Sequence, residues 1–335
     1  MPRDPRFVPP GSLQHVVDTT LDHRFLLRPD PRLNKILLGV LGRAQRLYAM
    51  PICAVVALST HLHLLVRPRD ARHLADFMCR LKTDLSKEVA RLRGLPKGPV
   101  FAGRFHNSTV SDEAAAQVRV LRYLLAHGVK EGLVDRVRDW PGVHCASHLM
   151  DGTPMQGLWI DRSAAHRRGR TVESAEKVQL VPLPCWEHLP DAEIRARVAE
   201  LVSNIDDRAA ARRRHEERPS LGIEAVLATD PLTRPSTEIS SPQPRVHAVD
   251  PRVRRHMLDA LRELFQAYRD ASSRLRKGDR QVRFPQGTFP PAMPFVSFEG
   301  TYHVPSFCLG GSMKVLCLES PSQLGAMHFP TRGRP

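Results

Sequence analysis

The first 135 residues show a regular pattern of apolar and polar positions. Residues 53–66 hold two apolar, β-branched runs separated by the polar pair Ser59 and Thr60, which predicts two buried strands joined by a turn. Similar short runs at residues 13–19 and 104–110 predict one strand before this pair and another after it. Four strands are enough to form one sheet with a buried face.

Longer segments repeat apolar residues every three to four positions, which is typical of helices with one buried face. Three such helices are predicted at residues 32–48, 71–92 and 111–127. With the strands, the chain order is β-α-β-β-α-β-α, which predicts an α+β fold with an antiparallel, ferredoxin-like sheet and helices packed on one face. A mainly helical C-terminal region follows, with helices predicted at 190–218 and 250–275.

From residue 136 the periodicity weakens. Residues 140–170 are rich in Gly, Pro, His and Arg, which predicts a loop-like covering segment or a linker. We therefore expect four parts in the chain: a first domain at 10–150, a linker or covering segment at 151–189, a helical accessory region at 190–280 and a poorly structured tail at 281–335.

Two histidines lie in the second strand of the central pair. Because side chains alternate along a strand, His61 and His63 project from the same face, with Leu62 on the other. Two imidazoles on one rigid strand provide half of a divalent metal site. The alternative is two polar residues on an exposed strand face, but an unpaired polar side chain is costly in an otherwise apolar run. His15, in the first strand, could face the same site or be an ordinary sheet residue, and we favour the second interpretation.

The helix predicted at 111–127 carries two further candidates. Tyr123 and His127 are four residues apart, so they lie on one face about one turn apart. A helix packed over the strand pair would therefore present a phenolic hydroxyl together with a third metal ligand. The alternatives are an aromatic side chain packed in the core and an imidazole favoured at a helix end by the helix dipole.

Three motifs occur in order along this part of the chain. They are His61-Leu62-His63, Arg104-Phe105-His106 and the segment from Leu121 to Val134, which contains Tyr123 and ends in Gly132-Leu133-Val134. This series resembles the single-tyrosine HUH transposases, and most closely their REP-associated branch, over about residues 10–150. The chain departs from that family at Thr60 and Thr19, where Asn and Arg are usual, and at His127-Gly128, where Asn-Pro is usual.

The resemblance implies a metal-dependent transposase that acts on single-stranded or hairpin DNA and commonly works as a homodimer. Tyr123 would be the nucleophile that forms a 5′-phosphotyrosine intermediate, and His61, His63 and His127 would hold the metal. Phosphate oxygens favour Mg2+ or Mn2+, although three imidazoles also suit Zn, Ni or Co. Two other functions stay open. One is a relative that binds hairpin DNA without cleaving it, which the departures from the family pattern favour, and the other is a metal-dependent hydrolase with water as the nucleophile.

The charge balance supports a nucleic-acid partner. The chain has 335 residues, with 50 Lys and Arg against 35 Asp and Glu, a formal net charge of +15. Arg104, Arg122 and Lys130 are the candidate phosphate contacts, with ordinary surface charge as the alternative. No apolar run reaches the roughly 18 residues of a spanning helix, the first residues lack the apolar core of a signal peptide, and no Gly-rich phosphate loop occurs. We therefore expect a cytoplasmic, nucleoid-associated protein without a nucleotide cofactor.

Overall fold

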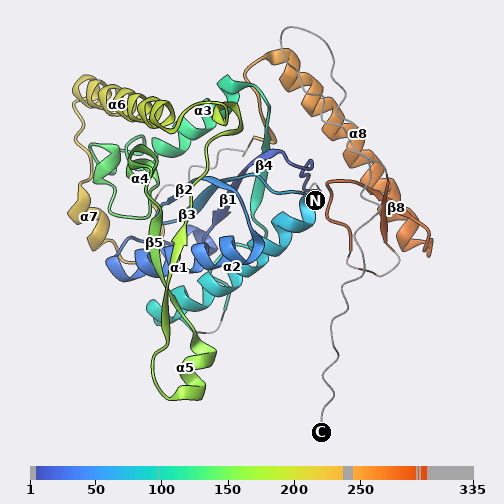
Figure 1. Cartoon of the computed structure of the whole chain (residues 1–335), viewed down its shortest axis with the longest axis horizontal. Helices are drawn as coiled ribbons and strands as arrows, with labels where there is room; N and C mark the ends of the chain where they lie inside the picture. The colour runs from blue at the N-terminus through green and yellow to red at the C-terminus, as the bar shows by residue number, and fades with distance from the viewer. Residues whose placement is uncertain (1–4, 97, 237–243, 292, 294–295, 300–335) are drawn as a thin grey trace.

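The computed structural model describes residues 5–299, except 97, 237–243, 292 and 294–295. A five-stranded sheet in the order β2-β3-β1-β4-β7 lies at its centre (Figure 1). Its strands are β1 (Leu13–Thr19), β2 (Ile52–Ala57), β3 (His61–Val66), β4 (His106–Val110) and β7 (Val246–His247). The first four pair antiparallel, and β7 joins β4 in parallel. The α+β class and the four predicted strands are confirmed.

Helices cover both faces of this sheet. They are α1 (Pro31–Tyr48) and α2 (Ala71–Leu92) on one side and α3 (Ala114–Leu125) on the other (Figure 1). Asp18 and His15 are three positions apart in β1, so their side chains project from opposite faces. Lys82 of α2 donates to Asp18 at 2.7 Å, whereas the His15 ring contacts the ring of Tyr123 in α3. The class is therefore as predicted, but the expectation that all helices pack on one face is corrected by the position of α3.

Acidic side chains cap the first two helices. The carboxylates of Asp30 and Asp70 each accept a backbone N–H three residues later, at 2.8 Å. The helices predicted at 32–48 and 71–92 are confirmed to within one residue. Helix α3 begins three residues later than predicted, because Ser111 lies outside the helix and its hydroxyl donates to the carboxylate of Glu113.

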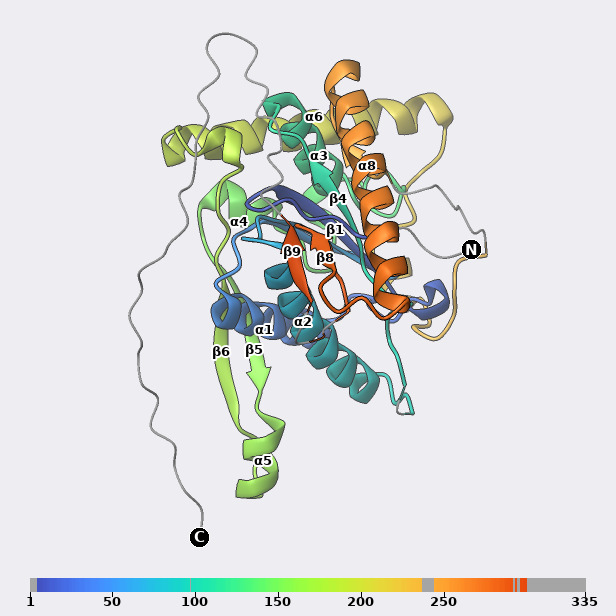
Figure 2. The ribbon, with the colours of Figure 1, turned by 90° about the vertical axis from the view of Figure 1, so that its right-hand side faces the viewer.

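A β-ribbon packs against α1 (Figure 2). It consists of β5 (Met155–Ile160) and β6 (Glu173–Val178), with α4 (Ala146–Asp151) before it and α5 (Arg162–Arg168) at its turn. The segment 140–170, expected to be loop-like, is therefore largely regular. Periodicity missed the ribbon because few of its side chains are buried. Glycines allow the close approach, since a Cβ at Gly39 of α1 would lie 2.1 Å from the backbone of Leu158.

The C-terminal region is mainly helical, as predicted. It contains α6 (Asp191–Glu216), α7 (Ile223–Ala228) and α8 (Pro251–Arg276), followed by the short parallel strands β8 (Arg283–Pro285) and β9 (Ser297–Glu299). Short 3-10 helices also occur at Leu21–His23, Val137–Asp139 and Pro184–Trp186. In Figure 1, α6 and α8 lie on either side of α3. Most of the tail predicted at 281–335 lies outside the described residues.

One hydrophobic core joins the sheet, α1 to α3, the β-ribbon and α6. Its buried side chains include Leu64 of β3, Phe77 of α2, Val178 of β6 and Val198 of α6. Helix α8 packs through a smaller cluster that includes Leu261, Leu264, Phe265 and Val246. The predicted division into four parts stays a prediction. In the described part of the chain, no helix combines the length and the apolarity needed to span a membrane.

Candidate metal centre and tyrosine site

Strand β3 fixes the position of two imidazoles. It lies between β2 and β1, and its register places His63 opposite Val56 on one side and Val17 on the other. His61 and His63 project from the same face, as the alternation predicts, and their ring centroids lie 4.6 Å apart. Because β3 is paired on both sides, its backbone holds both rings in place.

Helix α3 brings Tyr123 and His127 to this face, with ring centroids 4.7 Å apart. Just past the helix end the chain turns at Gly128, whose φ of +87° disfavours residues with a side chain. The His127 ring centroid lies 4.2 Å from that of His63 and 5.9 Å from that of His61. One potential ligand atom of each histidine lies within 4.8 Å of the others. We call His61, His63 and His127 the three-histidine cluster.

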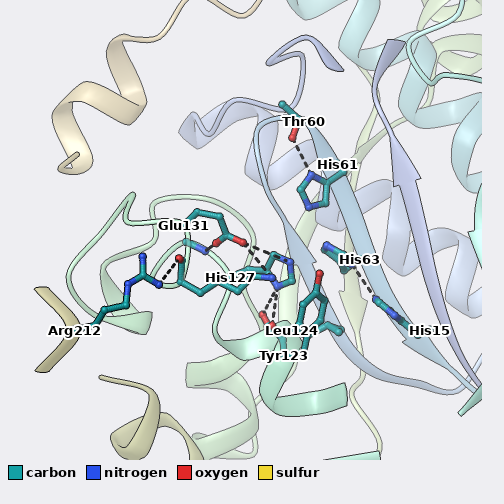
Figure 3. A network of polar contacts seen from close by, with 11 residues as sticks. His15, Thr60, His61, His63, Tyr123, Leu124, His127, Glu131 and Arg212 are labelled. Carbon is teal, nitrogen blue, oxygen red and sulfur yellow. Dashed lines mark hydrogen bonds and ion pairs between the residues drawn. The ribbon is translucent and has the colours of Figure 1, made fainter. Parts of the chain in front are cut away.

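Each imidazole of this cluster has a partner at Nδ1. Thr60 Oγ1 lies 2.8 Å from Nδ1 of His61, and Nε2 of His15 lies 3.0 Å from Nδ1 of His63. Nδ1 of His127 donates to a backbone carbonyl of α3 at 2.8 Å. A metal-binding imidazole has this arrangement, in which one nitrogen is hydrogen-bonded and the other offers its lone pair. The three Nε2 atoms are therefore the candidate ligands (Figure 3).

This donor set fits a divalent cation. Nε2 of His63 is buried and has no hydrogen-bond partner among the described residues, a costly state unless a ligand satisfies it. Burial lowers the pKa of His61 to about 4 and the pKa of His127 to about 2, and it lowers the pKa of His63 well below its ordinary value. The charge of Lys130 lowers the pKa of all three further. Near pH 7 the three rings are neutral, which is the form that binds a metal.

Tyr123 lies at the edge of the three-histidine cluster, with 41% of its surface exposed. Its ring centroid is 6.0 Å from that of His63, and Figure 3 shows its hydroxyl pointing toward the strand imidazoles. Lys130 Nζ lies 3.6 Å from the centroid of the tyrosine ring. A phosphate bound at the cluster would therefore lie beside a phenol and a cationic side chain.

His15 contacts this site, so its interpretation as an ordinary sheet residue was wrong. Its Nε2 contacts His63, and its Nδ1 lies 3.1 Å from Nε2 of His247 in β7. The rings of His63, His15 and His247 therefore form a continuous hydrogen-bonded series. Sequence spacing could not show this, because the contacts depend on the register of β1 with β3 and on the return of β7 to the sheet. The available signal was a second imidazole in an apolar strand.

The three predicted phosphate contacts lie in different places. Lys130 faces the ring of Tyr123. Arg122 is half-buried and, with Lys130, lines a hollow of about 770 Å³ between α3 and α6. Arg104 is exposed and lines a separate hollow with Arg6 and Phe265. The structure thus brings Lys130 to the site, places Arg122 beside it and leaves Arg104 apart.

Comparisons with known proteins give similarity at the level of structure. No protein-family model matches the chain, and no curated protein matches it. One similar solved structure is a REP-associated tyrosine transposase bound to a REP hairpin, with 20% identity and a TM-score of 0.35 over 42% of this chain and 81% of that one. Another is a candidate transposase from Deinococcus radiodurans, with 18% identity and a TM-score of 0.27 over 36% of this chain and 95% of that one. TM-scores this low describe partial similarity, so the geometry of the site carries the proposal below.

Proposed function

We propose that the protein is a metal-dependent transposase that cuts and rejoins single-stranded DNA, with Tyr123 as the nucleophile. The observation that carries the proposal is the position of the Tyr123 ring beside three histidines whose Nε2 atoms are the candidate ligands for one cation. A protonated phenol is a weak nucleophile, so the reaction needs a polarised phosphate. We propose that a cation held by the three-histidine cluster would supply that polarisation.

The reaction exchanges one phosphate ester for another. Oη of Tyr123 attacks the phosphorus of the scissile phosphate, and the bond from phosphorus to the preceding 3′ oxygen breaks. The phenol loses its proton, and the departing oxygen takes one up. The products are a 5′-phosphotyrosine and a free 3′ hydroxyl, and attack by such a hydroxyl reverses the step and joins two strands. Because the ester energy is conserved, the reaction needs no nucleotide cofactor.

His61, His63 and His127 would hold the divalent cation through Nε2. When bound, that cation withdraws negative charge from the phosphoryl oxygens and orients the phosphate for in-line attack. We propose Mg2+ or Mn2+, because phosphate oxygens would complete the ligand set and both ions favour oxygen ligands. Lys130, which lies over the Tyr123 ring and pairs with Glu131 at 3.3 Å, is the cation that we propose would offset the charge of the phosphate. The net charge of +15 and the sequence motifs support single-stranded or hairpin DNA as the substrate.

A covalent-adduct assay on denaturing gels tests this function. The wild-type protein, incubated with Mn2+ and hairpin-bearing oligonucleotides, should form a protein–DNA adduct that a chelator prevents. Tyr123→Phe should abolish the adduct because it removes the attacking oxygen. Tyr48→Phe is the matched control, since Tyr48 ends α1 on the other face of the sheet and should form the adduct normally.

The same assay separates the other two candidate functions. Tight binding of hairpin DNA with no adduct in the wild-type protein would support a DNA-binding relative. Strand cleavage that persists in Tyr123→Phe would support a hydrolase with water as the nucleophile. Either result would contradict the tyrosine transposase.

We also propose a homodimer in which each chain carries its own complete site. The homodimer follows from the family resemblance, whereas the support for a complete site in each chain is that Tyr123 and the three-histidine cluster converge within one chain. A mixture of Tyr123→Phe and His63→Ala proteins should therefore form no adduct. A site shared between subunits would instead restore about a quarter of the wild-type yield, as expected from random pairing of two subunits.

A further inference from the structure

A groove of about 820 Å³ runs between α3 and α8 and reaches Tyr123. Its lining includes His15 and, from the segment before α8, Pro244 and residues 246–249. Figure 2 shows α8 beside α3, and Figure 1 shows α6 on the other side of α3. This hollow, which we call the α3–α8 groove, therefore gives access to Tyr123 from the side on which α8 lies.

Specific contacts hold the start of α8 in place. Strand β7 pairs with β4, so the segment before α8 is part of the central sheet. The carboxylate of Glu113, the residue that precedes α3, accepts the backbone N–H groups of Val249 and Asp250 at 3.1 and 2.8 Å. His247 in β7 contacts His15, which contacts His63. The segment before α8 is thus connected by hydrogen bonds to His15 in β1 and, through it, to His63 in β3.

The groove is strongly basic. Its lining includes Arg119 of α3 and Arg254, Arg255 and Arg262 of α8, against one carboxylate, that of Asp259. Arg262 pairs with Asp259 at 2.5 Å. Arg119, Arg254 and Arg255 are exposed and have no ion-pair partner within the described residues. Three uncompensated guanidinium groups line a path that leads to the tyrosine.

We propose that the α3–α8 groove binds the DNA single strand that flanks the scissile phosphate, through its phosphates. This inference rests on the proposed function and extends it to the C-terminal region. Guanidinium groups bind phosphates in a bidentate manner. Arg254 and Arg262 are eight residues apart, about 12 Å along the helix, so the groove is long enough to contact more than one phosphate of an extended strand.

The remaining lining favours a strand that is held by its backbone. Between the arginines the groove surface is aliphatic, with Val246, Val249 and Leu258. Among the described residues, the aromatic rings that line the groove are those of Tyr123, His15 and His247. Binding that relies on phosphates in this way is insensitive to base sequence and sensitive to salt. Recognition of a hairpin sequence would then belong to another surface.

The test measures binding separately from chemistry. All proteins carry Tyr123→Phe, and the probes are a fluorescent oligothymidine strand and a blunt DNA duplex of similar length. Arg254→Gln combined with Arg255→Gln should weaken oligothymidine binding by about 20-fold at 0.1 M salt and reduce the slope of log affinity against log salt by about 1.4, because two phosphate contacts are lost. Adding Arg119→Gln, on the opposite wall, should weaken binding further. Duplex binding should change much less.

The matched control is Arg269→Gln with Arg276→Gln. Both residues are exposed on α8 outside the groove lining, so this variant loses the same charge and should keep its affinity and salt slope. Equal losses in the two double variants, or no loss in either, would overturn the inference. Circular dichroism confirms that each variant keeps its helices.

The two proposals fail in different ways. If wild-type protein forms no adduct but the groove arginines still control single-strand binding, the transposase function fails and the groove stands. If the adduct forms at Tyr123 but the groove arginines have no effect on binding, the groove inference fails alone.

Discussion

The ring of His15 determines which nitrogen of His63 faces the three-histidine cluster. For His63 to offer the lone pair of Nε2, its Nδ1 must carry the proton and donate to Nε2 of His15. His15 then carries its own proton on Nδ1 and donates to His247. This tautomer of His63, with the proton on Nδ1, is the one that metal binding through Nε2 requires. His15 acts on the metal through His63, so it is a positioning residue.

We predict that His15→Ala weakens metal binding by about 10- to 100-fold, the usual effect of removing the partner of a ligand histidine. His15→Gln should recover part of the affinity, because its amide oxygen can accept the same hydrogen bond. Calorimetric titration with Mn2+ measures the effect.

His106→Ala is the control for this prediction. His106 lies on the neighbouring strand β4, and its ring contacts Ser108 and Pro244. Unchanged Mn2+ affinity in His15→Ala, or an equal loss in the control, would show that His15 does not position the ligand.

At the residue scale, local spacing predicted the core of the site. Two-residue spacing in a strand places His61 beside His63, and four-residue spacing at a helix end places Tyr123 beside His127. The structure brings these two pairs together. His15 could not be assigned in the same way, since its contact with His63 spans 48 residues and depends on strand register. Contacts set by tertiary structure leave no periodic trace in the sequence.

At the scale of elements, periodicity predicted the helices and strands that bury a continuous apolar face. It failed for β5 and β6, where the signal is carried by glycines rather than by buried apolar residues. Cβ atoms at Gly39 and Gly157 would each lie 2.1 Å from backbone atoms of the other element, so only glycine allows α1 and β5 to approach this closely. A glycine inside a helix pattern predicts such a contact only when its partner is known.

We predict that Gly39→Ala destabilises the protein by about 1–3 kcal/mol, the range for overpacking a buried contact. At an open helix position, replacing glycine by alanine would instead raise the free energy of unfolding by at most about 1 kcal/mol, because alanine has the higher helix propensity. The steric term should therefore decide the sign. Urea denaturation measures the free energy of unfolding of Gly39→Ala and of a control variant. Gly98→Ala is the control, because its Cβ would meet one atom, Pro96 O at 3.9 Å. A stabilised Gly39→Ala protein would show that the helix and ribbon are not in close contact.

At the scale of the whole molecule, two hollows lined by arginines lie on either side of α3. The hollow beside α6 is lined by Arg208, Arg212, Arg213 and Arg218, and the α3–α8 groove carries its own arginines on the opposite side. Tyr123 and Lys130 lie between these two basic surfaces. Composition predicted a nucleic-acid partner, but it could not predict this arrangement, because α6 and α8 are more than 60 residues from α3 in the sequence. The C-terminal region therefore contributes surface to the approach to the site.

The most direct test of the central claim is mass spectrometry of the covalent product. After reaction with Mn2+ and a hairpin oligonucleotide, nuclease and trypsin treatment should leave a nucleotide on peptide 123–130, whose one tyrosine is Tyr123. We predict that this modified peptide forms with metal and is absent after chelation. A modified peptide that maps elsewhere in the chain, or DNA cleaved with no modified peptide, would contradict it.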